Sequence, residues 1–409
     1  MRTNKQDWKN LAILGGEPAF ADPLYVGRPN IGDKKSLFAR IEDMLTRRWL
    51  SNGGPFVQEL EHRIEQLLEV QHCIITCNGT MALQIAARAL GLTGEVIVPS
   101  FTFVATAHAL EWIGLTPVFC DVDPLTHNIN PVELEQALSP RSSGIIGVHL
   151  WGRACDTESL ENIARRNSLE LMFDAAHAFN CSHKGQMIGN FGKLEVLSFH
   201  ATKFFNTFEG GAIVTNDTTI AEKARLMRDF GFLATDKVVS IGINGKMTEV
   251  AAAMGLTGLE SINQIIETNF YNYKEYQAAL SEIPGISIIS YDETDKNNFH
   301  YIILEIEEDV FGMNRDQLLK ILNAEKVMAR RYFYPGCHRS EPYRSSSKYN
   351  GLRMPVTELL SNRVLALPNG TALGHGDVGK ICYLIKMISN NSQEIRQVIN
   401  GTKAQVPKV

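Results

Sequence analysis

Short apolar runs alternate with helix-like stretches between residues 95 and 174 of this chain. β-Branched and aromatic residues dominate the runs, which are short enough to be buried strands. The expected strands are Glu95–Val98, Pro117–Val122, Gly144–Leu150 and Leu169–Phe173, separated by the expected helices Ala105–Ile113, Pro131–Leu138 and Thr157–Asn167. Strands that alternate with helices predict a mostly parallel sheet with helices on both faces, which is an α/β fold.

The length of 409 residues exceeds what one hydrophobic core usually serves and predicts two domains. A single long helix is expected from Glu249 to Ala279. After it, the strands Ile286–Ile289 and Tyr301–Ile306 and the helix Arg315–Asn323 indicate a smaller α+β domain. We therefore predict a large domain over 1–265 and a small one over 266–409.

The composition is that of a soluble globular enzyme, with 44% hydrophobic and 21% charged residues. A net charge of −5 and a pI of about 6.1 provide no basic surface for nucleic acid. No run is long and apolar enough to span a membrane, and the first residues lack a signal-peptide core. We expect a cytoplasmic protein whose seven cysteines are reduced and whose chemistry uses no metal.

Lys203 lies in the segment Ser198–Gly211, directly before the strand-like run Ala212–Thr215. One interpretation of Lys203 is a lysine that forms a covalent bond with an aldehyde cofactor. An amine attacks a carbonyl only when it is neutral, so a lysine with this role needs a lowered pKa. Phenylalanines on both sides of Lys203 offer an apolar environment. The alternative is an ordinary lysine that packs its stem and keeps its charge in water.

Asp174 follows the expected strand Leu169–Phe173. The carboxyl end of such a strand opens into the crevice where α/β sheets bind ligands, and a carboxylate there can pair with the ring nitrogen of pyridoxal phosphate. A helix cap is the competing interpretation for an isolated aspartate at this place.

Asn78-Gly79-Thr80 connects the expected strand Cys73–Cys77 to an alanine-rich helix that begins at Met81. Small residues that open a helix after a strand can form an anion site, because unpaired N–H groups face the ligand. An ordinary strand-to-helix turn explains the same residues. Combined with Asp174 and Lys203, however, the turn would complete a set of partners for a phosphate, a ring nitrogen and an aldehyde.

The chain resembles the DegT/DnrJ/EryC1/StrS family of pyridoxal-phosphate-dependent nucleotide-sugar aminotransferases, which have fold type I. The resemblance covers nearly the whole chain. It rests on the segments Trp49–Pro55, Asn78–Thr80, Pro99–Thr106 and Gly242–Met247, together with Asp174 and Lys203. The family replaces its lysine by histidine in a dehydratase branch, so Lys203 favours transamination.

The resemblance implies a pyridoxal 5'-phosphate site and a role for each matching residue. Lys203 would carry the cofactor aldehyde and act as general acid and base, and Asp174 would hold the pyridine nitrogen. Phe103 would stack on the ring, while His177, where glutamine is common, would reach the phenolic oxygen. Phosphate ligands would come from the turn with Gly79 and Thr80 and from Ser198, and Asn244 would reach the phosphate of a neighbouring subunit. The resemblance therefore also implies a homodimer with shared active sites.

The combination of His200–Lys203, Asn206, Glu209–Gly211 and Arg331–His338 is most similar to family members that aminate C4 of dTDP-4-dehydro-6-deoxy-D-glucose, with L-glutamate as donor. The aromatic, positively charged strip Arg330–His338 is expected to form part of the sugar-nucleotide site. We expect Arg331, Tyr332 and His338 to contact this nucleotide sugar, although a packed segment explains the strip equally well. A different keto sugar, either a 3-keto sugar or a 4-keto sugar giving the galacto epimer, remains open. So do a fold type I lyase and a non-catalytic cofactor-binding regulator.

Overall fold

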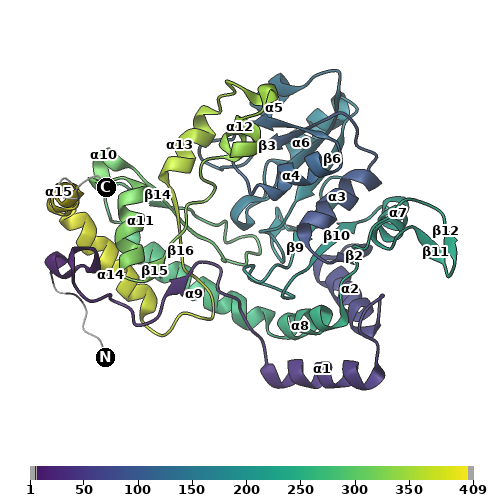
Figure 1. Cartoon of the computed structure of the whole chain (residues 1–409), viewed down its shortest axis with the longest axis horizontal. Helices are drawn as coiled ribbons and strands as arrows, with labels where there is room; N and C mark the ends of the chain where they lie inside the picture. Colours follow the sequence, from purple (N-terminus) through teal and green to yellow (C-terminus); the bar gives the residue numbers. More distant parts are fainter. Residues whose placement is uncertain (1–4, 6, 404–409) are drawn as a thin grey trace, which may run out of the picture.

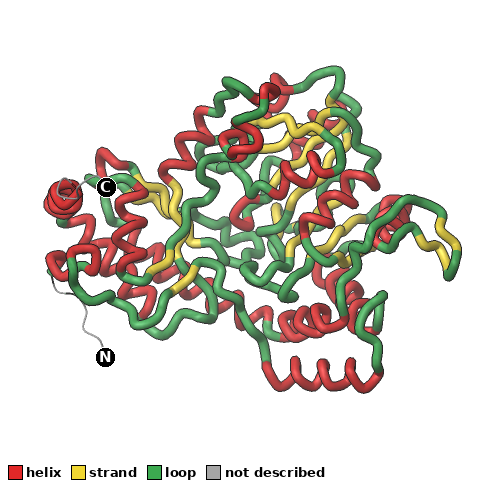
Figure 2. The backbone as a smooth tube through the Cα atoms, viewed as in Figure 1, coloured by secondary structure: helices red, strands yellow, loops and turns green. Residues whose placement is uncertain are grey.

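The computed structural model describes residues 5 and 7–403, and its centre is a seven-stranded sheet (Figures 1 and 2). The strand order is β2-β10-β9-β6-β5-β3-β4. The bounds are β2 (His72–Thr76), β3 (Glu95–Pro99), β4 (Thr116–Cys120), β5 (Ser142–Val148), β6 (Glu170–Asp174), β9 (Leu194–Ser198) and β10 (Gly211–Thr215). The expected mostly parallel sheet is confirmed, because β10 alone runs in the opposite direction to the other six strands.

Helices cover both faces of this sheet, as predicted, because successive strand residues point to opposite sides. In β2, Ile74 packs on one face, while Cys73 and Ile75 pack on the other. The first face is covered by α3 (Gly79–Ala89), α4 (Ala105–Trp112) and α7 (Thr218–Arg228). The second face is covered by α1 (Lys34–Arg47), α2 (Pro55–Leu68), α5 (Pro131–Ala137), α6 (Thr157–Arg166) and α8 (Glu249–Glu260).

The single long helix expected from Glu249 to Ala279 is wrong, because the structure has two helices there. α8 ends at Glu260 and α9 (Ile262–Leu280) begins two residues later, since Ser261 has non-helical angles of φ −102° and ψ 3°. α8 is buried on nearly all sides, whereas α9 continues to the smaller sheet (Figure 1).

A three-stranded antiparallel sheet, β13-β14-β16, forms the core of the C-terminal part. Its strands, β13 (Ile286–Ile288), β14 (Ile302–Ile306) and β16 (Val364–Leu367), agree with the predicted α+β architecture. The helices around it are α10 (Glu308–Phe311), α11 (Arg315–Ala324), α13 (Pro355–Arg363), α14 (Asp377–Asn390) and α15 (Ser392–Lys403). The short helix α12 (Glu341–Arg344) packs instead on the large part, where Tyr343 contacts Phe119.

The N-terminal residues pack with this C-terminal part. β1 (Leu24–Tyr25) pairs in parallel with β15 (Val327–Met328), and Leu11 and Phe20 share a hydrophobic core with α9, α11 and α14. Figure 1 shows the purple N-terminal segment beside the yellow C-terminal helices. The division at residue 265 therefore stays a prediction, and residues 8–25 pack with the part beyond it.

The hairpin of β11 (Phe232–Ala234) and β12 (Lys237–Val238) projects from the large part of the molecule (Figure 1). Its apolar side chains are exposed over a continuous stretch of sequence, comprising Phe230, Phe232, Leu233, Val238, Val239, Ile241 and Ile243. Within the described residues, no helix is both long and apolar enough to cross a membrane.

Candidate active site

A cavity of about 360 Å³ opens at the carboxyl edge of the central sheet. β2, β6 and β9 all end there, because β2 and β9 run antiparallel to the same strand and β6 runs parallel to β9. Eight of the predicted site residues line it: Gly79, Thr80, Phe103, Asp174, His177, Ser198, Lys203 and Tyr332. Segments far apart in the sequence are thus brought to one place, as α/β ligand sites require.

Lys203 lies in the loop between β9 and β10, and buried phenylalanines hold this loop on both sides. Phe199, Phe204 and Phe205 are all at most 3% exposed. Burial lowers the pKa of the Lys203 amine to about 8, with Asp174 opposing this shift and Arg330 adding to it. The amine donates a hydrogen bond to the hydroxyl of Tyr301, at 3.4 Å. It is therefore a lysine with a substantial neutral fraction near neutral pH.

Asp174 is the last residue of β6 and is 6% exposed. Its carboxylate accepts hydrogen bonds from the hydroxyl of Thr106 at 2.8 Å and from the backbone N–H of Ala176 at 3.1 Å. Burial raises the pKa of Asp174, whereas Thr106, Ala176 and the charge of Lys203 lower it. The competing interpretation, a helix cap, does not hold, because Ala176 lies in no helix and Thr106 of α4 donates through its side-chain hydroxyl, not through a backbone N–H.

The predicted anion site lies at the start of α3. Asn78 caps this helix by accepting a hydrogen bond from the N–H of Met81 at 2.8 Å, and the first-turn N–H groups have no acceptor within the helix. Gly79 lies close to Ser198, since a Cβ added there would be 3.1 Å from the Ser198 side chain. The turn therefore combines backbone donors with the hydroxyls of Thr80 and Ser198.

The glycine pair Gly210-Gly211, at the start of β10, allows this close packing. A Cβ on Gly211 would lie 2.6 Å from the backbone nitrogen of Gly79, and one on Gly210 would lie 2.0 Å from Thr207 Oγ1. A side chain on Gly211 would therefore push β10 away from the start of α3, and one on Gly210 would clash within the lysine loop itself.

His177 is held as a neutral ring with a defined tautomer. Its Nδ1 accepts a hydrogen bond from the backbone N–H of Trp151 at 3.3 Å, so the ring hydrogen is on Nε2. Burial and the charge of Lys203 place the pKa of His177 well below its ordinary value. The ring packs against Tyr301, with centroids 4.3 Å apart. Across the cavity, Phe103 is 56% exposed, which leaves a face of its ring available for stacking.

Sequence reasoning missed the contribution of residues 298–301, which come from the smaller part. Asn298 donates hydrogen bonds to the carbonyl oxygens of His177 and Phe179, and His300 Nε2 donates to that of Thr202. Together with Tyr301, these residues fix both loops that carry the reactive groups. The polar residues Asp292–Asn298 before β14 were the available sequence signal for a functional segment. The sequence did not place this segment beside Lys203, because its position depends on how the two parts of the chain pack together.

The C-terminal strip meets the cavity at Arg330, Tyr332 and Phe333, but not at Arg331 or His338. Arg331 faces away, 3.5 Å from Asp316 Oδ1, with its guanidinium over Tyr334. His338 is buried, with Nδ1 2.6 Å from Ser100 Oγ. Neither side chain lines the cavity and both have other partners, so the structure gives no support to their predicted substrate contacts.

Asn244 also lies outside the cavity, where its backbone forms a bridge with that of Asp229. The neighbouring Gly245 accepts a hydrogen bond from the N–H of Cys77 at 2.7 Å, which ties this loop to the end of β2. The contact predicted for Asn244 is with the cofactor phosphate of a neighbouring subunit, which a single chain cannot test.

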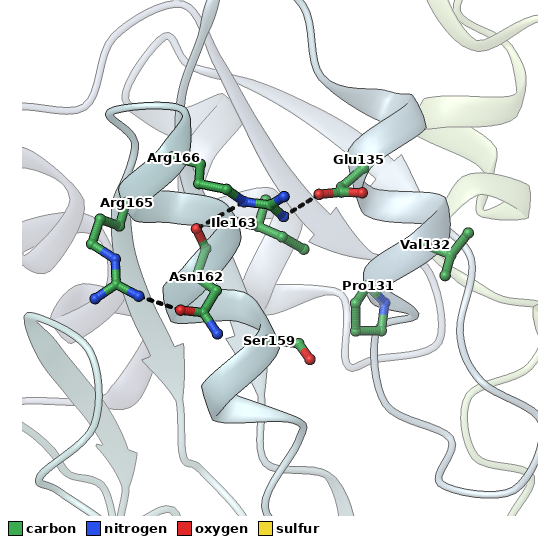
Figure 3. A pocket seen from close by; sticks show the side chains of 8 residues that line it. All are labelled: Pro131, Val132, Glu135, Ser159, Asn162, Ile163, Arg165 and Arg166. Carbon is green, nitrogen blue, oxygen red and sulfur yellow. Dashed lines mark hydrogen bonds and ion pairs between the residues drawn. The ribbon is translucent and has the colours of Figure 1, made fainter.

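A second, more open hollow of about 530 Å³ lies between α5 and α6 (Figure 3). Its two arginines are engaged by neighbours, Arg166 with Glu135 and Arg165 with Asn162. The hollow lacks a buried reactive side chain, so we place the chemistry in the cavity around Lys203. Within the described part of the chain, no three histidine, cysteine or acidic side chains gather as a metal site.

A lysine of lowered pKa, a buried carboxylate and a helix N-terminus at the carboxyl edge of this sheet are the groups expected of a fold type I pyridoxal-phosphate-dependent enzyme. The chain belongs to the DegT/DnrJ/EryC1/StrS aminotransferase family, whose pattern matches residues 32–386. The predicted fold class, enzyme class and cofactor, pyridoxal 5'-phosphate, are confirmed, and so is a sugar-nucleotide substrate.

Three relatives support this assignment. A Shigella dysenteriae protein named dTDP-4-amino-4,6-dideoxy-D-glucose transaminase is 39% identical over 313 residues, 76% of this chain and 85% of its own. The structure of DesI in the presence of its TDP-sugar product has a TM-score of 0.91 at 46% identity, covering 95% of this chain and 98% of DesI. The structure of NtdA from Bacillus subtilis with the cofactor PMP bound has a TM-score of 0.80 at 25% identity, covering 87% and 82%. These matches favour an aminotransferase over the lyase and regulator alternatives.

Proposed function

We propose that this chain transfers the amino group of L-glutamate to C4 of dTDP-4-dehydro-6-deoxy-D-glucose, giving dTDP-4-amino-4,6-dideoxy-D-glucose and 2-oxoglutarate. The observation that carries the proposal is the pairing of Lys203 and Asp174 in one cavity. The choice of sugar draws on the names of the Shigella relative and of DesI with its TDP-sugar product.

The donor groups of the cavity fit the cofactor. Asp174 would bind the protonated pyridine nitrogen, for which a buried carboxylate is the suitable partner. The N–H groups at the start of α3, with Thr80 and Ser198, would hold the phosphate. His177, with its hydrogen on Nε2, is a donor suited to the phenolic oxygen, and Phe103 would stack on the ring.

When bound, pyridoxal phosphate supplies an aldehyde and an electron-withdrawing ring that makes the C–H bond beside an attached nitrogen acidic. Lys203 would hold the aldehyde of the cofactor and, in the first half of the cycle, would take the proton from the α-carbon of the donor. In the second half of the cycle Lys203 delivers a proton to C4 of the sugar. A pKa of about 8 suits both directions of proton transfer near neutral pH.

The active form is proposed to be a homodimer in which Asn244 reaches the cofactor phosphate of the other subunit. The exposed apolar side chains from Phe230 to Ile243 support this arrangement, because many exposed apolar side chains in one segment are typical of a surface that a partner covers. A cytoplasmic location also remains a prediction.

The decisive experiment loads the enzyme with the pyridoxamine form of the cofactor and supplies a panel of dTDP-, UDP- and GDP-linked keto sugars. We expect amination of dTDP-4-dehydro-6-deoxy-D-glucose, with the amino group at C4 in the gluco configuration by NMR. Reaction only with a 3-keto sugar or a non-thymidine sugar would contradict the substrate, and a galacto product would contradict the stereochemistry.

The role of Lys203 is tested separately with borohydride, which traps a lysine-bound cofactor covalently. Wild-type enzyme should yield the trapped peptide containing Lys203, and Lys203→Ala should not. An unchanged adduct in the variant would assign the anchor to another lysine.

A further inference from the structure

A small recess lies beside Lys203 and shares part of its wall with the main cavity. Its volume is about 10 Å³, close to the space that one water-sized group such as an ammonium needs. Lys203, Ser198 and Tyr301 line both the recess and the main cavity. The recess also has three phenylalanines in its wall, each at most 3% exposed: Phe179, Phe204 and Phe205.

His300 lines the same recess and is held in a fixed orientation. It is 6% exposed, and its backbone N–H donates to Asn298 Oδ1 at 3.1 Å. Its Nε2 donates to the carbonyl oxygen of Thr202 at 3.1 Å, so the ring hydrogen is on Nε2 and Nδ1 is an acceptor. This Nδ1 is buried and has no hydrogen-bond partner among the residues that the structure describes. A buried acceptor of this kind indicates a donor that binds it in another state of the enzyme.

The amine of Lys203 is a donor that changes its partners during the proposed cycle. It leaves the cofactor when the incoming amine takes its place, and it becomes an ammonium when it takes the proton from the donor. A buried ammonium has three N–H donors, all of which need acceptors. Within the described part of the chain, the amine has one hydrogen bond, to the Tyr301 hydroxyl at 3.4 Å.

Other side-chain acceptors in the recess are already in use. His177 Nδ1 accepts the backbone N–H of Trp151, and Ser198 is assigned to the phosphate of the cofactor. His300 is close enough to feel the charge of Lys203, because burial and this charge lower the pKa of His300 to about 4. The His300 ring is therefore neutral near neutral pH, and its Nδ1 lone pair is available to a donor.

We infer that Lys203, when it is released from the cofactor, turns its amine into this recess and donates a hydrogen bond to His300 Nδ1. The inference rests on the role proposed for Lys203 and deepens it by naming a second residue that contacts the reacting amine. The rings of His300 and Tyr301 pack edge to face, with centroids 4.7 Å apart, so neighbouring residues of one segment contact the amine in its two positions.

Two amide variants separate this role of His300 from its bond to Thr202. In His300→Gln the amide nitrogen can replace Nε2 and keep the bond to Thr202, but no acceptor remains at the position of Nδ1. In His300→Asn the shorter side chain places its oxygen near the position of Nδ1 and does not reach Thr202. If His300 only supported the loop, His300→Asn would be the more damaging change, whereas our inference predicts that His300→Gln is.

The first measurement uses no substrate. Competitive acetylation of the cofactor-free enzyme reports the pKa of the Lys203 amine, with the exposed Lys184 as reference in the same sample. Because an acceptor favours the charged amine, we expect the midpoint for His300→Gln to lie about one pH unit below that of wild type. The midpoint for His300→Asn should stay close to that of wild type.

The second measurement follows the proton transfer in the pyridoxal-phosphate-loaded enzyme. Stopped-flow spectroscopy compares L-glutamate with glutamate deuterated at the α-carbon. In His300→Gln we expect the rate of proton transfer to fall about tenfold and the isotope effect on the observed rate to increase. The apparent dissociation constant for glutamate should be unchanged, because the hydrogen bond to the ammonium forms only as the proton arrives.

A crystal structure of the pyridoxamine-loaded enzyme tests the contact directly. We expect Lys203 Nζ within about 3.2 Å of His300 Nδ1, the range of an N–H hydrogen bond. A separation above about 4 Å would overturn the inference.

Two results with the variants would also overturn it. In one, His300→Gln has the labelling midpoint and the proton-transfer rate of wild type. In the other, His300→Asn is impaired more than His300→Gln, which would make the bond to Thr202 the important one. A wild-type enzyme that reacts with glutamate but with no dTDP-linked keto sugar would refute the proposed substrate and leave the assignment of His300 intact.

Discussion

Neutralising Asp174 or Arg330 should move the pKa of Lys203 in opposite directions. In the structure, burial lowers this pKa from its ordinary value of 10.5 to about 8. The carboxylate of Asp174 opposes the shift, because it favours the charged amine, and Arg330 reinforces it. We therefore expect Asp174→Asn to lower the pKa of Lys203 further and Arg330→Met to raise it.

The lowered pKa of Lys203 determines how much of its amine is neutral, and therefore nucleophilic, at a given pH. At pH 7.5 an amine with a pKa of about 8 is about one quarter neutral, whereas one with a pKa of 10.5 is about 0.1% neutral. The structure thus makes Lys203 about 240-fold richer in the nucleophilic form than an ordinary lysine at this pH.

The assay is competitive labelling of the cofactor-free enzyme with limiting acetic anhydride between pH 6 and 10.5, followed by mass spectrometry of the peptides. The labelling rate of Lys203 should have its midpoint near pH 8, lower in Asp174→Asn and higher in Arg330→Met. Lys184, whose side chain is 71% exposed, serves as the reference in the same sample. A wild-type midpoint above about pH 9.5, or an upward shift in Asp174→Asn, would refute the electrostatic reasoning.

Three further changes test contacts seen in the structure. Tyr301→Phe removes the hydrogen-bond partner of Lys203 and should lower the rate of both half-reactions about tenfold, as measured by stopped flow. Cofactor affinity, measured by equilibrium dialysis, should be nearly unchanged. Rates equal to those of wild type would exclude a role for the hydroxyl. Thr106→Val removes a hydrogen-bond donor to Asp174 and should raise the pKa of that carboxyl. As the pH is lowered, the variant should therefore lose activity at a higher pH than wild type. An unchanged acidic side of the pH–activity profile would contradict this. Glu325→Ala removes the acceptor of the Ala12 and Ala19 N–H groups and one of the two acceptors of Lys5 Nζ, and should cost about 2 to 4 kcal/mol in urea unfolding of the C-terminal part. A loss below about 1 kcal/mol would show that these bonds contribute little.

Lys203, Asp174 and Ser198 were predictable because each lies at or just after the end of an apolar run. In a mostly parallel sheet the carboxyl ends of such runs meet at one edge, so residues distant in sequence converge without further information. Local chemistry and strand order together were sufficient for this part of the site.

Arg330 and Arg331 show where that reasoning fails. Adjacent residues in an extended segment point to opposite sides, and a shift of one residue exchanges which side is buried. The sequence indicated that an arginine of this strip meets the substrate, but the alternation alone did not determine which one. The pairing of Arg330 with Ala366 decides it.

Tyr301 was missed for a different reason. Its neighbours predict a strand of the smaller sheet, which is correct, and the hydroxyl reaches Lys203 only because the two parts of the chain pack together there. Such contacts depend on the relative placement of whole units, which no local pattern encodes.

The pairing of β1 with β15 also affects how this protein is made. On the ribosome, Leu24 emerges about 300 residues before its partner Val327, which at typical elongation rates is a delay of roughly 15 s to 1 min. Throughout that time the apolar side chains of Leu11, Phe20 and Leu24 lack the core in which they are finally buried. The large sheet can form during synthesis, but the nascent N-terminal segment is a site for chaperones until the last strands have been translated.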